Sequence, residues 1–271
     1  MTYNTYAPSQ ELEILLKCFW RLEAAGTSRP EKQRIVPDGC MEMIFHYGDL
    51  FKQFTGDGRF FIQPRCFVFG QITSPLDIEP TGITGVFAAR FHPGGFQAFT
   101  TMTLKEMENR AVPLQELFGV DGLALEGDIL RASTTEERII LADQFLLKRL
   151  ETSQTIDWVT KSSVEILLKL NGQVSVNELS EKLQINRRQL ERKFSSVIGL
   201  SPKQLSKIIR LQATLKMLEK KEFTSLTSLA YENGYYDQTH FINDFKEFTG
   251  VTPKQFYASN LRMSALFIAE D

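Results

Sequence analysis

The chain has 271 residues, with 31 Lys and Arg against 33 Asp and Glu and a formal net charge of −2. Its 42% hydrophobic and 24% charged residues are ordinary for a globular protein and exclude global disorder. At roughly 100–200 residues per domain, this length predicts one large or two ordinary domains. No stretch is long and apolar enough to predict a membrane-spanning helix, and residues 1–10 contain no secretion signal. We therefore expect a cytoplasmic protein without a membrane partner.

The first half of the chain favours strands and then helices. Residues 34–47, 60–70 and 82–91 are rich in Val, Ile and Phe and are separated by Gly and Pro. A capping box at 103–106 and a long amphipathic helix over 136–151, opened by Thr134 or Thr135, follow. The apolar positions of this helix are Ile139, Ile140, Phe145, Leu146 and Leu150. We predict an α+β chain of two domains, the first a small β-barrel with packed helices.

Charge divides the chain at the same place. Residues 1–154 contain 15 basic and 20 acidic side chains, whereas residues 155–260 contain 15 and 11. A basic block behind an acidic one suggests a second domain that faces a polyanion. The predicted domains are residues 1–151 and 157–260, joined by a linker at 152–156 and followed by a tail at 261–271.

The second half contains an internal repeat. Residues 194–205 match residues 245–256 at an offset of 51, with identical Phe, Gly, Pro, Lys and Gln at five positions. In each copy a helix ends at Gly199 or Gly250, and a new one begins after Ser201 or Thr252 as N-cap. A helix over 202–219, about 27 Å long at 1.5 Å per residue, joins the copies.

Each copy is preceded by a short helix and a turn. The first unit has helices at 176–183 and about 186–198, and the second has helices at 226–233 and about 237–249. Ser175, Asn186 and Asp237 are the predicted caps. The predicted inward positions are Leu179, Leu183, Ile185, Leu190 and Phe194 in unit one, and Ala230, Tyr236, Phe241 and Phe245 in unit two. These are two helix-turn-helix units, the shape that presents a second helix to the major groove of DNA.

Residues 158–258 resemble the AraC/XylS family of bacterial transcription regulators, most specifically over Leu229–Phe256. The resemblance implies an all-α domain that binds a bipartite promoter site on double-stranded DNA, with both second helices in successive major grooves. RNA polymerase is a further partner that the resemblance implies.

The resemblance also assigns candidate DNA contacts. In unit one they are Arg187, Arg188, Glu191, Arg192 and Lys193; in unit two they are Gln238, Thr239, His240, Ile242 and Asn243. Arg suits guanine, Glu suits cytosine, and Gln or Asn suits adenine. Phosphate contacts are expected from Lys193, Lys203, Lys207, Arg210, Lys246 and Lys254. Ile242 and Asp244 depart from the polar or basic residues often found there, which predicts weaker base reading by unit two.

Residues 34–45, 69–72 and 90–96 resemble the cupin-like sensing domains that precede this module. A cavity in a small barrel is a natural site for a small-molecule effector. The polar candidates for its wall are Arg34, Asp38, Glu42, Arg90 and His92. Each of these residues also has a purely structural alternative in a turn or a strand.

Other classes of protein fit less well. An iron cupin enzyme needs two or three histidines with a carboxylate, whereas His46 and His92 lack the HxH spacing. We therefore expect no enzyme activity, no metal and no cofactor. Cys18, on a predicted apolar helix, and Cys66, on a strand, suit inert core thiols. A thiol-based redox or alkylation sensor that uses Cys40 remains an alternative, as does a constitutive DNA-binding or dimerisation protein with no effector. Homodimer formation is open.

Overall fold

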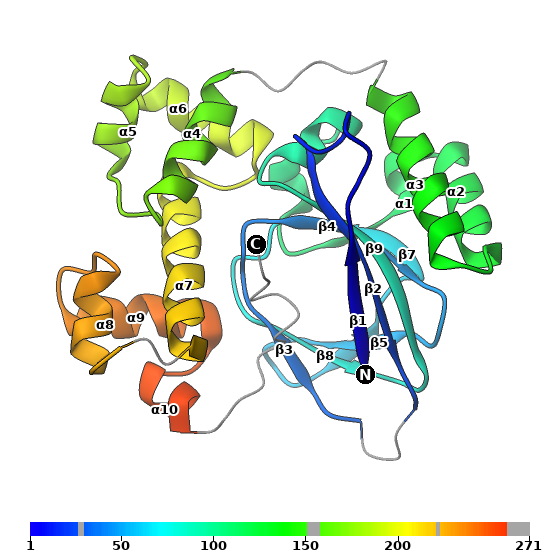
Figure 1. Ribbon diagram of the computed structural model, residues 1–271, viewed down its shortest axis with the longest axis horizontal. Coiled ribbons are helices and arrows are strands. Elements are labelled where there is room, and N and C mark those ends of the chain that lie inside the picture. Colours follow the sequence, from blue (N-terminus) through cyan, green and yellow to red (C-terminus); the bar gives the residue numbers. More distant parts are fainter. Residues whose placement is uncertain (27–29, 151–157, 221–222, 259–271) are drawn as a thin grey trace.

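Figure 1 shows the computed structural model, which describes residues 1–26, 30–150, 158–220 and 223–258; a sheet-rich domain lies beside a helical one. The predicted linker at 152–156 and tail at 261–271 lie outside the described residues. The N-terminal domain is built on a six-stranded antiparallel sheet. In spatial order its strands are β1 (Thr2–Tyr6), β2 (Leu16–Ala24), β9 (Thr84–Phe91), β4 (Met41–His46), β7 (Cys66–Phe69) and β10 (Ala111–Pro113).

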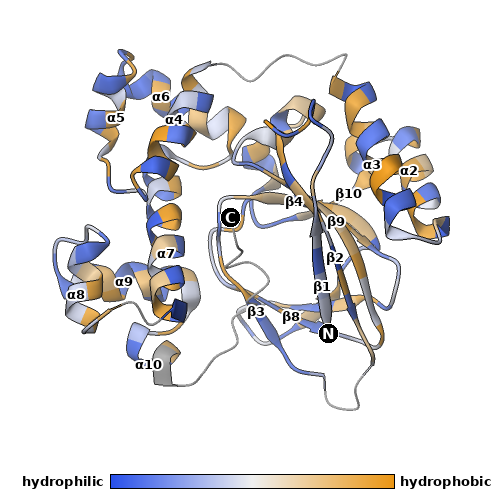
Figure 2. Cartoon of the chain, in the orientation of Figure 1, coloured by the Kyte–Doolittle hydropathy of each residue, from blue (hydrophilic) through white to orange (hydrophobic). Residues whose placement is uncertain are grey.

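Both faces of this sheet are covered, as the alternating directions of the side chains along β4 show. Met41, Met43 and Phe45 point into a core shared with the helices, whereas Ile44 packs in clusters with residues of the second sheet. Successive side chains of a strand face opposite sides, so a strand covered on both sides must be almost wholly apolar. Every residue of β9 is buried, and Figure 2 colours β9 mainly as hydrophobic.

A second, four-stranded antiparallel sheet covers one face. Its order is β3 (Gln33–Ile35), β8 (Leu76–Pro80), β5 (Phe51–Phe54) and β6 (Phe60–Ile62). Short helices cover the other face: η1 (Gly95–Phe99), η2 (Leu104–Met107), α1 (Leu114–Phe118), α2 (Val120–Arg131) and α3 (Thr135–Leu150). The predicted sheet domain with packed helices is confirmed, but its described strands form two separate sheets and their hydrogen bonds do not close a barrel.

Two local predictions are wrong. The apolar segment that carries Cys18 is not a helix: the Leu15 and Leu16 amides bond to the Leu12 carbonyl in a turn, and the chain then continues as β2. Pairing with β1 and β9 on both sides outweighs the local pattern. In α3, Thr134 caps the helix as predicted, with its Oγ1 accepting from the Glu137 amide at 3.1 Å. Ile140, however, is 54% exposed, because the buried face of the helix is the one that carries Ala142 and Leu146.

The second domain is helical. It contains α4 (Trp158–Lys169), α5 (Val176–Lys182), α6 (Arg187–Val197), α7 (Pro202–Lys220), α8 (Leu226–Glu232), α9 (Gln238–Thr249) and α10 (Pro253–Ala258). In Figure 1, α7 runs between α4–α6 at one end and α8–α10 at the other. The predicted glycine ends are confirmed, since Gly199 and Gly250 have φ of 82° and 76°. One core, centred on Phe194, Phe241 and Phe245, holds the helices together.

Gly172, after α4, is clamped against α7. Its carbonyl accepts from Ser206 Oγ at 2.8 Å and Arg210 Nη2 at 2.9 Å, and a Cβ there would lie 2.1 Å from the Ser206 carbonyl oxygen. With φ of 69° as well, we predict that Gly172→Ala lowers the free energy of unfolding by about 2–4 kcal/mol. Urea unfolding followed by circular dichroism measures this change.

The matched control is Gly56→Ala, because nothing lies within 4 Å of a Cβ at that position. Equal stability of the two variants would contradict the close approach of Gly172 to α7.

Candidate nucleic-acid interface and effector cavity

Unit one is fixed by its caps. Ser175 Oγ accepts from the Glu178 amide at 3.1 Å, and the Glu178 carboxylate accepts from the Ser175 amide at 2.8 Å. These hydrogen bonds lower the pKa of Glu178. Asn186 Oδ1 accepts from the Gln189 amide at 2.9 Å and starts α6. The two caps predicted for this unit are therefore confirmed.

Leu190 and Phe194 turn one face of α6 into the core. Arg188 and Arg192 are exposed on the same side of the helix, one turn apart. Arg187 is exposed too, and its Nε donates to Glu191 Oε1 at 2.8 Å. Lys193 is half-buried. The predicted contact residues of unit one thus lie on or beside the exposed face of α6.

Unit two has a turn that is one residue longer. The Ile185 and Tyr235 amides, 50 residues apart, make equivalent hydrogen bonds to the preceding helix, whereas the caps Asn186 and Asp237 are 51 residues apart. The additional residue is Tyr236. Its predicted inward position is wrong: Tyr235 is buried and Tyr236 is 88% exposed, because the turn shifts the register by one residue.

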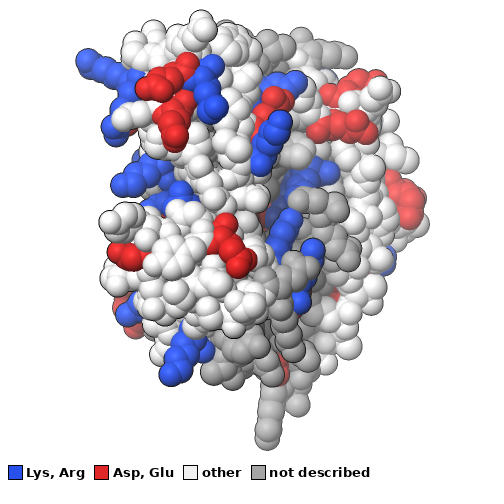
Figure 3. Space-filling view, turned by 60° about the vertical axis from the view of Figure 1, so that its left-hand side comes forward, with Lys and Arg blue, Asp and Glu red and all other residues white. Residues whose placement is uncertain are grey.

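Helix α9 presents a polar surface at its N-terminal end. Gln238, Thr239 and Asn243 are exposed, as is Lys246 further along, and Ile242 is half-buried. Figure 3 shows the Lys and Arg side chains of the helical domain scattered over one face, interspersed with acidic groups.

Asp244 faces away from this surface. It is 5% exposed, and its Oδ1 forms an ion pair with Lys207 Nζ of α7 at 2.8 Å. Its Oδ2 lies 3.3 Å from His240 Nε2. His240 also packs edge-on against Tyr235, with ring centroids 5.3 Å apart. An acidic residue at position 244, where a polar or basic residue is expected, is therefore explained by its contact with α7.

Lys207 and Arg210, two predicted phosphate contacts, take part in helix packing. Lys207 also pairs with Glu247 at 2.9 Å. Arg210 donates to the Gly172 carbonyl and lies over the Tyr235 ring, 5.1 Å from its centroid. The predicted contacts Lys203 and Lys254 are exposed.

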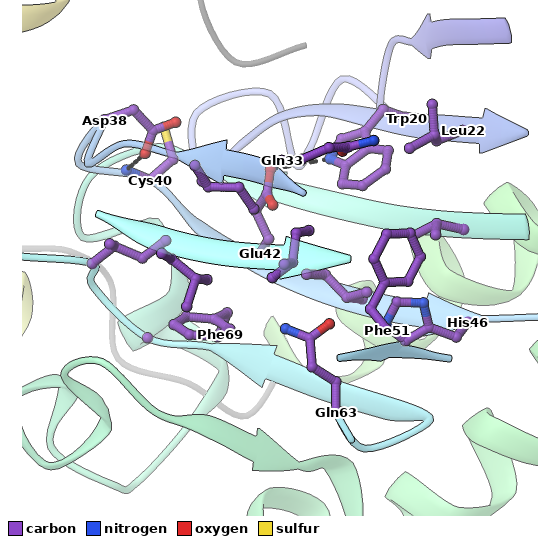
Figure 4. A pocket seen from close by; sticks show the side chains of 17 residues that line it. Trp20, Leu22, Gln33, Asp38, Cys40, Glu42, His46, Phe51, Gln63 and Phe69 are labelled. Carbon is purple, nitrogen blue, oxygen red and sulfur yellow. Dashed lines mark hydrogen bonds between the residues drawn. The ribbon is translucent and has the colours of Figure 1, made fainter. Parts of the chain in front are cut away.

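A cavity of about 60 Å³ lies between the two sheets of the N-terminal domain. Asp38 and Glu42 line it, as predicted, and Arg90 forms ion pairs with Asp38 and, at 3.5 Å, with Glu42 Oε1. Figure 4 shows Asp38 and Cys40 at one end of the cavity, Glu42 near its middle and His46 towards the opposite end. Burial raises the pKa of Glu42 to about 7, although the charge of Arg90 acts in the opposite direction.

Three predicted wall residues do not line this cavity. Arg90 pairs with two residues that do, and itself lines a hollow between the domains. Arg34 on β3 donates from Nε and Nη2 to the two carboxylate oxygens of Asp77 on β8, at 2.7 and 2.8 Å. Its Nη1 donates to the Thr249 carbonyl of α9 at 3.2 Å. The side chain of Arg34 therefore serves the contact between the domains. His92, which follows the last residue of β9, lines two hollows between the domains, of about 440 and 280 Å³.

His46 is a cavity residue that the sequence analysis missed. It follows Glu42 by four residues on β4, so alternation alone places both side chains on one face. His46 is 3% exposed, and burial lowers its pKa to about 4, with the nearby Gln63 acting in the opposite direction. The side chain is therefore neutral at pH 7.

The thiol alternative is not favoured. Burial, with the charge of Asp38 adding to it, raises the pKa of Cys40 to about 12. Burial also raises the pKa values of Cys18 and Cys66. A protonated thiol is a weak nucleophile. Within the described ranges, no three His, Cys, Asp or Glu side chains cluster as a metal site, and no described helix is long and apolar enough to cross a membrane.

Comparison with known proteins separates the two parts of the chain. Residues 4–113 match a domain of unknown function (DUF6597), and residues 179–259 match a helix-turn-helix domain. The C-terminal domain is an AraC-type helix-turn-helix domain.

The matched relatives are transcriptional regulators. MtrA of Neisseria gonorrhoeae is 32% identical over 92 residues, which is 34% of this chain and 30% of MtrA. An uncharacterised HTH-type regulator of Haemophilus influenzae is 28% identical over 96 residues, 35% of this chain and 32% of that protein. The aligned part thus spans about a third of each relative.

Among solved structures, ToxT from Vibrio cholerae is similar with a TM-score of 0.48 and 13% identity, over 89% of this chain and 98% of ToxT. The C-terminal domain of AraT from Geobacillus stearothermophilus has a TM-score of 0.37 and 21% identity, over 39% of this chain and 88% of that one.

The AraC-type domain is held by the N-terminal domain at several places. Gln212 of α7 donates to the Pro37 carbonyl at 2.7 Å, and a Cβ at Gly39 would lie 2.8 Å from Leu205 Cδ1. A Cβ at Gly199, after α6, would lie 2.8 Å from the Leu104 carbonyl oxygen of η2. With Arg34 at the end of α9, the N-terminal domain contacts the C-terminal ends of both second helices.

The neutral His46 makes stability depend on pH. Its pKa of about 4 in the folded protein lies below the ordinary 6.5, so the unfolded chain binds a proton that the folded chain does not. Stability is therefore lost as pH falls from 6.5 towards 4, by about 3 kcal/mol at most. Urea unfolding of the wild type and of His46→Asn between pH 4 and 7 measures this.

The quantity to compare is the difference in unfolding free energy between the wild type and His46→Asn at each pH. The raised pKa of Glu42 changes stability in the opposite direction over part of the same pH range, and this change is common to both proteins. Parallel pH profiles would contradict a neutral, buried His46.

Proposed function

We propose that this protein is a sequence-specific DNA-binding transcription regulator of the AraC type, with α6 and α9 entering successive major grooves of a bipartite promoter site. The observation that carries the proposal is the pair of capped helix-turn-helix units on one core. Helix α7, with 19 residues, is about 28 Å long at 1.5 Å per residue. It is a rigid spacer close in length to the ~34 Å between successive major grooves on one face of DNA.

The exposed side chains suit this role. Arg188 and Arg192 are placed to read guanine, and Gln238 and Asn243 are placed to read adenine. Lys203, Lys246 and Lys254 serve phosphates. Tyr236 extends the surface, because it is exposed directly before α9, whose first turn approaches the bases.

The N-terminal domain, proposed as residues 1–151, acts as a cupin-like sensing domain, and residues 157–260 form the DNA-binding domain. The turn at 37–40 supports control by an effector: Asp38 and Cys40 line the cavity, whereas Pro37 and Gly39 contact α7. Dimerisation through this domain is the second route of control. The two matched relatives are named as HTH-type transcriptional regulators, which supports a non-enzymatic role in the cytoplasm with RNA polymerase as a partner.

Selection of binding sites from random double-stranded DNA tests the proposed function. The full-length protein is expected to enrich two short motifs about one helical turn apart. One motif only would mean that unit two grips phosphates without reading bases. Absence of enrichment, both with the full chain and with residues 155–271, would refute the proposal.

Arg188→Ala and Arg192→Ala are each expected to cost about 1–3 kcal/mol on the selected site and to relax base choice at one position. The physical reason is loss of a bidentate hydrogen bond to guanine. Fluorescence anisotropy with the selected site and single-base variants measures both effects.

Arg131→Ala is the matched control, because this exposed arginine lies on α2 of the other domain. A loss of equal size on random DNA would show that Arg188 or Arg192 contacts phosphate. Affinity on the selected site should also fall with salt, with a log–log slope of about −0.9 per neutralised phosphate.

A further inference from the structure

The described residues that line the cavity between the two sheets include the carboxyl groups of Asp38 and Glu42 but no Lys or Arg. Arg90, 4% exposed, faces Asp38 and Glu42. Its contact with Asp38 is a direct ion pair, whereas Glu42 Oε1 is 3.5 Å from the guanidinium and accepts from Trp20 Nε1 at 3.1 Å. Asp38 also shares the 280 Å³ hollow between the domains with Lys17, whereas Glu42 does not line that hollow. Glu42 is therefore the less well compensated of the two carboxyl groups.

The groups around Glu42 act on its charge in both directions. Arg90 on β9 is the cation that most affects its charge, and Asp38 on the adjoining turn adds negative charge. The thiols Cys18 on β2 and Cys40 have raised pKa values and are neutral at pH 7. A buried carboxylate in such a setting is stabilised by one further positive charge.

The rest of the wall is aromatic and apolar. Trp20 and Phe69 lie on the six-stranded sheet and Phe51 lies on the other, and aliphatic side chains fill the space between them. Aromatic faces attract organic cations and accommodate a hydrocarbon body. A hydrated inorganic cation gains nothing from such a wall.

His46 adds a second polar point to the cavity. It is almost fully buried and lines the cavity together with Gln63, whose side chain acts on its pKa. The carboxyl group of Glu42 and the neutral ring of His46 thus face the same cavity from one strand. The charged end of a ligand is therefore expected at Glu42 and its uncharged end towards His46.

We propose that this cavity binds a small organic amine, with its ammonium group on Glu42 and its apolar body between Trp20 and Phe51, pointing towards His46. This inference rests on the proposed effector role of the N-terminal domain and specifies the class of its ligand. The volume of about 60 Å³ restricts the ligand to a few heavy atoms, since a 150 Å³ cavity already holds benzene. Anions are disfavoured by the two carboxylates.

Occupancy would reach the AraC-type domain through the turn at 37–40. Asp38 and Cys40 also line the 280 Å³ hollow between the domains, together with Gln212 of α7. An ammonium group on Glu42 competes with Arg90 for that carboxylate, which changes the hold of Arg90 on Asp38. The turn that carries Asp38 contacts α7 through Pro37 and Gly39.

Titration of the full-length protein with ethylamine, ethanol and acetate by calorimetry at pH 7.5 tests the proposal. The three probes differ little in size but differ in charge. The amine is expected to bind saturably and about 10-fold or more tighter than the alcohol, since a charge-assisted hydrogen bond is roughly twice as strong as a neutral one. Acetate should not bind. Equal binding of amine and alcohol, or no saturable binding of the amine, would overturn the inference.

Glu42→Gln should weaken amine binding by about 10-fold or more and leave the alcohol unchanged, whereas the exposed Glu116→Gln should change neither. In a Trp158→Phe background the sole tryptophan is Trp20, and its emission should shift with the amine. An unchanged emission, or Glu42→Gln that still binds amine like the wild type, would refute the site. Selection of DNA sites is a separate measurement, so its success alongside failed amine binding would discard only this inference.

Discussion

The charge of Arg90 is the constraint on which much of the N-terminal domain depends. Arg90 lies in a strand that is covered on both faces, and its side chain is only 4% exposed, so its charge must be neutralised by neighbours. Asp38 can provide this only if the turn at 37–40 folds back over the sheet. Glu42 is required one strand away, directly opposite Arg90 in the β4–β9 register. One buried cation thus determines both the polar end of the cavity and the position of the turn that contacts α7.

The turn at 37–40 joins the sheet domain to α7, and the two domains are packed in different ways. In the N-terminal domain an alternating strand pattern buries one set of side chains under helices and the other under a second sheet. In the AraC-type domain, aromatic residues at helical spacing hold two similar units on α7. The contacts between the domains touch α7 and the C-terminal ends of α6 and α9, so the surface with Arg188 and Gln238 stays exposed. The N-terminal domain therefore braces the two second helices without covering the residues proposed to read DNA.

Local signals in the sequence were sufficient wherever the structure is local. The caps at Ser175, Asn186 and Asp237 depend on residues three apart, and each was predicted correctly. Features that depend on distant partners were not accessible. The segment around Cys18 reads as a helix until its two partner strands are known. The role of Arg34 depends on Thr249, 215 residues away.

Misplacement of Tyr236 had a different origin. The repeat was aligned at one constant offset, whereas the first helices of the units are 50 residues apart and the second helices 51. By contrast, His46 could have been found from β4 alone, because it alternates with Glu42 on the same face. The closed barrel could not be decided from strand patterns, since inward alternation is the same for a barrel and for two facing sheets.

The longer turn of unit two gives the AraC-type domain a polarity. A symmetric dimer of identical readers binds a palindrome equally well in both directions, but two tandem, unequal units on one rigid helix do not. With Gln184 in one turn and Gly234 and the additional Tyr236 in the other, the leading and trailing halves of the bound DNA meet different surfaces. A single copy of the chain can therefore point along a promoter, and the inserted residue adds to the difference that the unlike second helices already make.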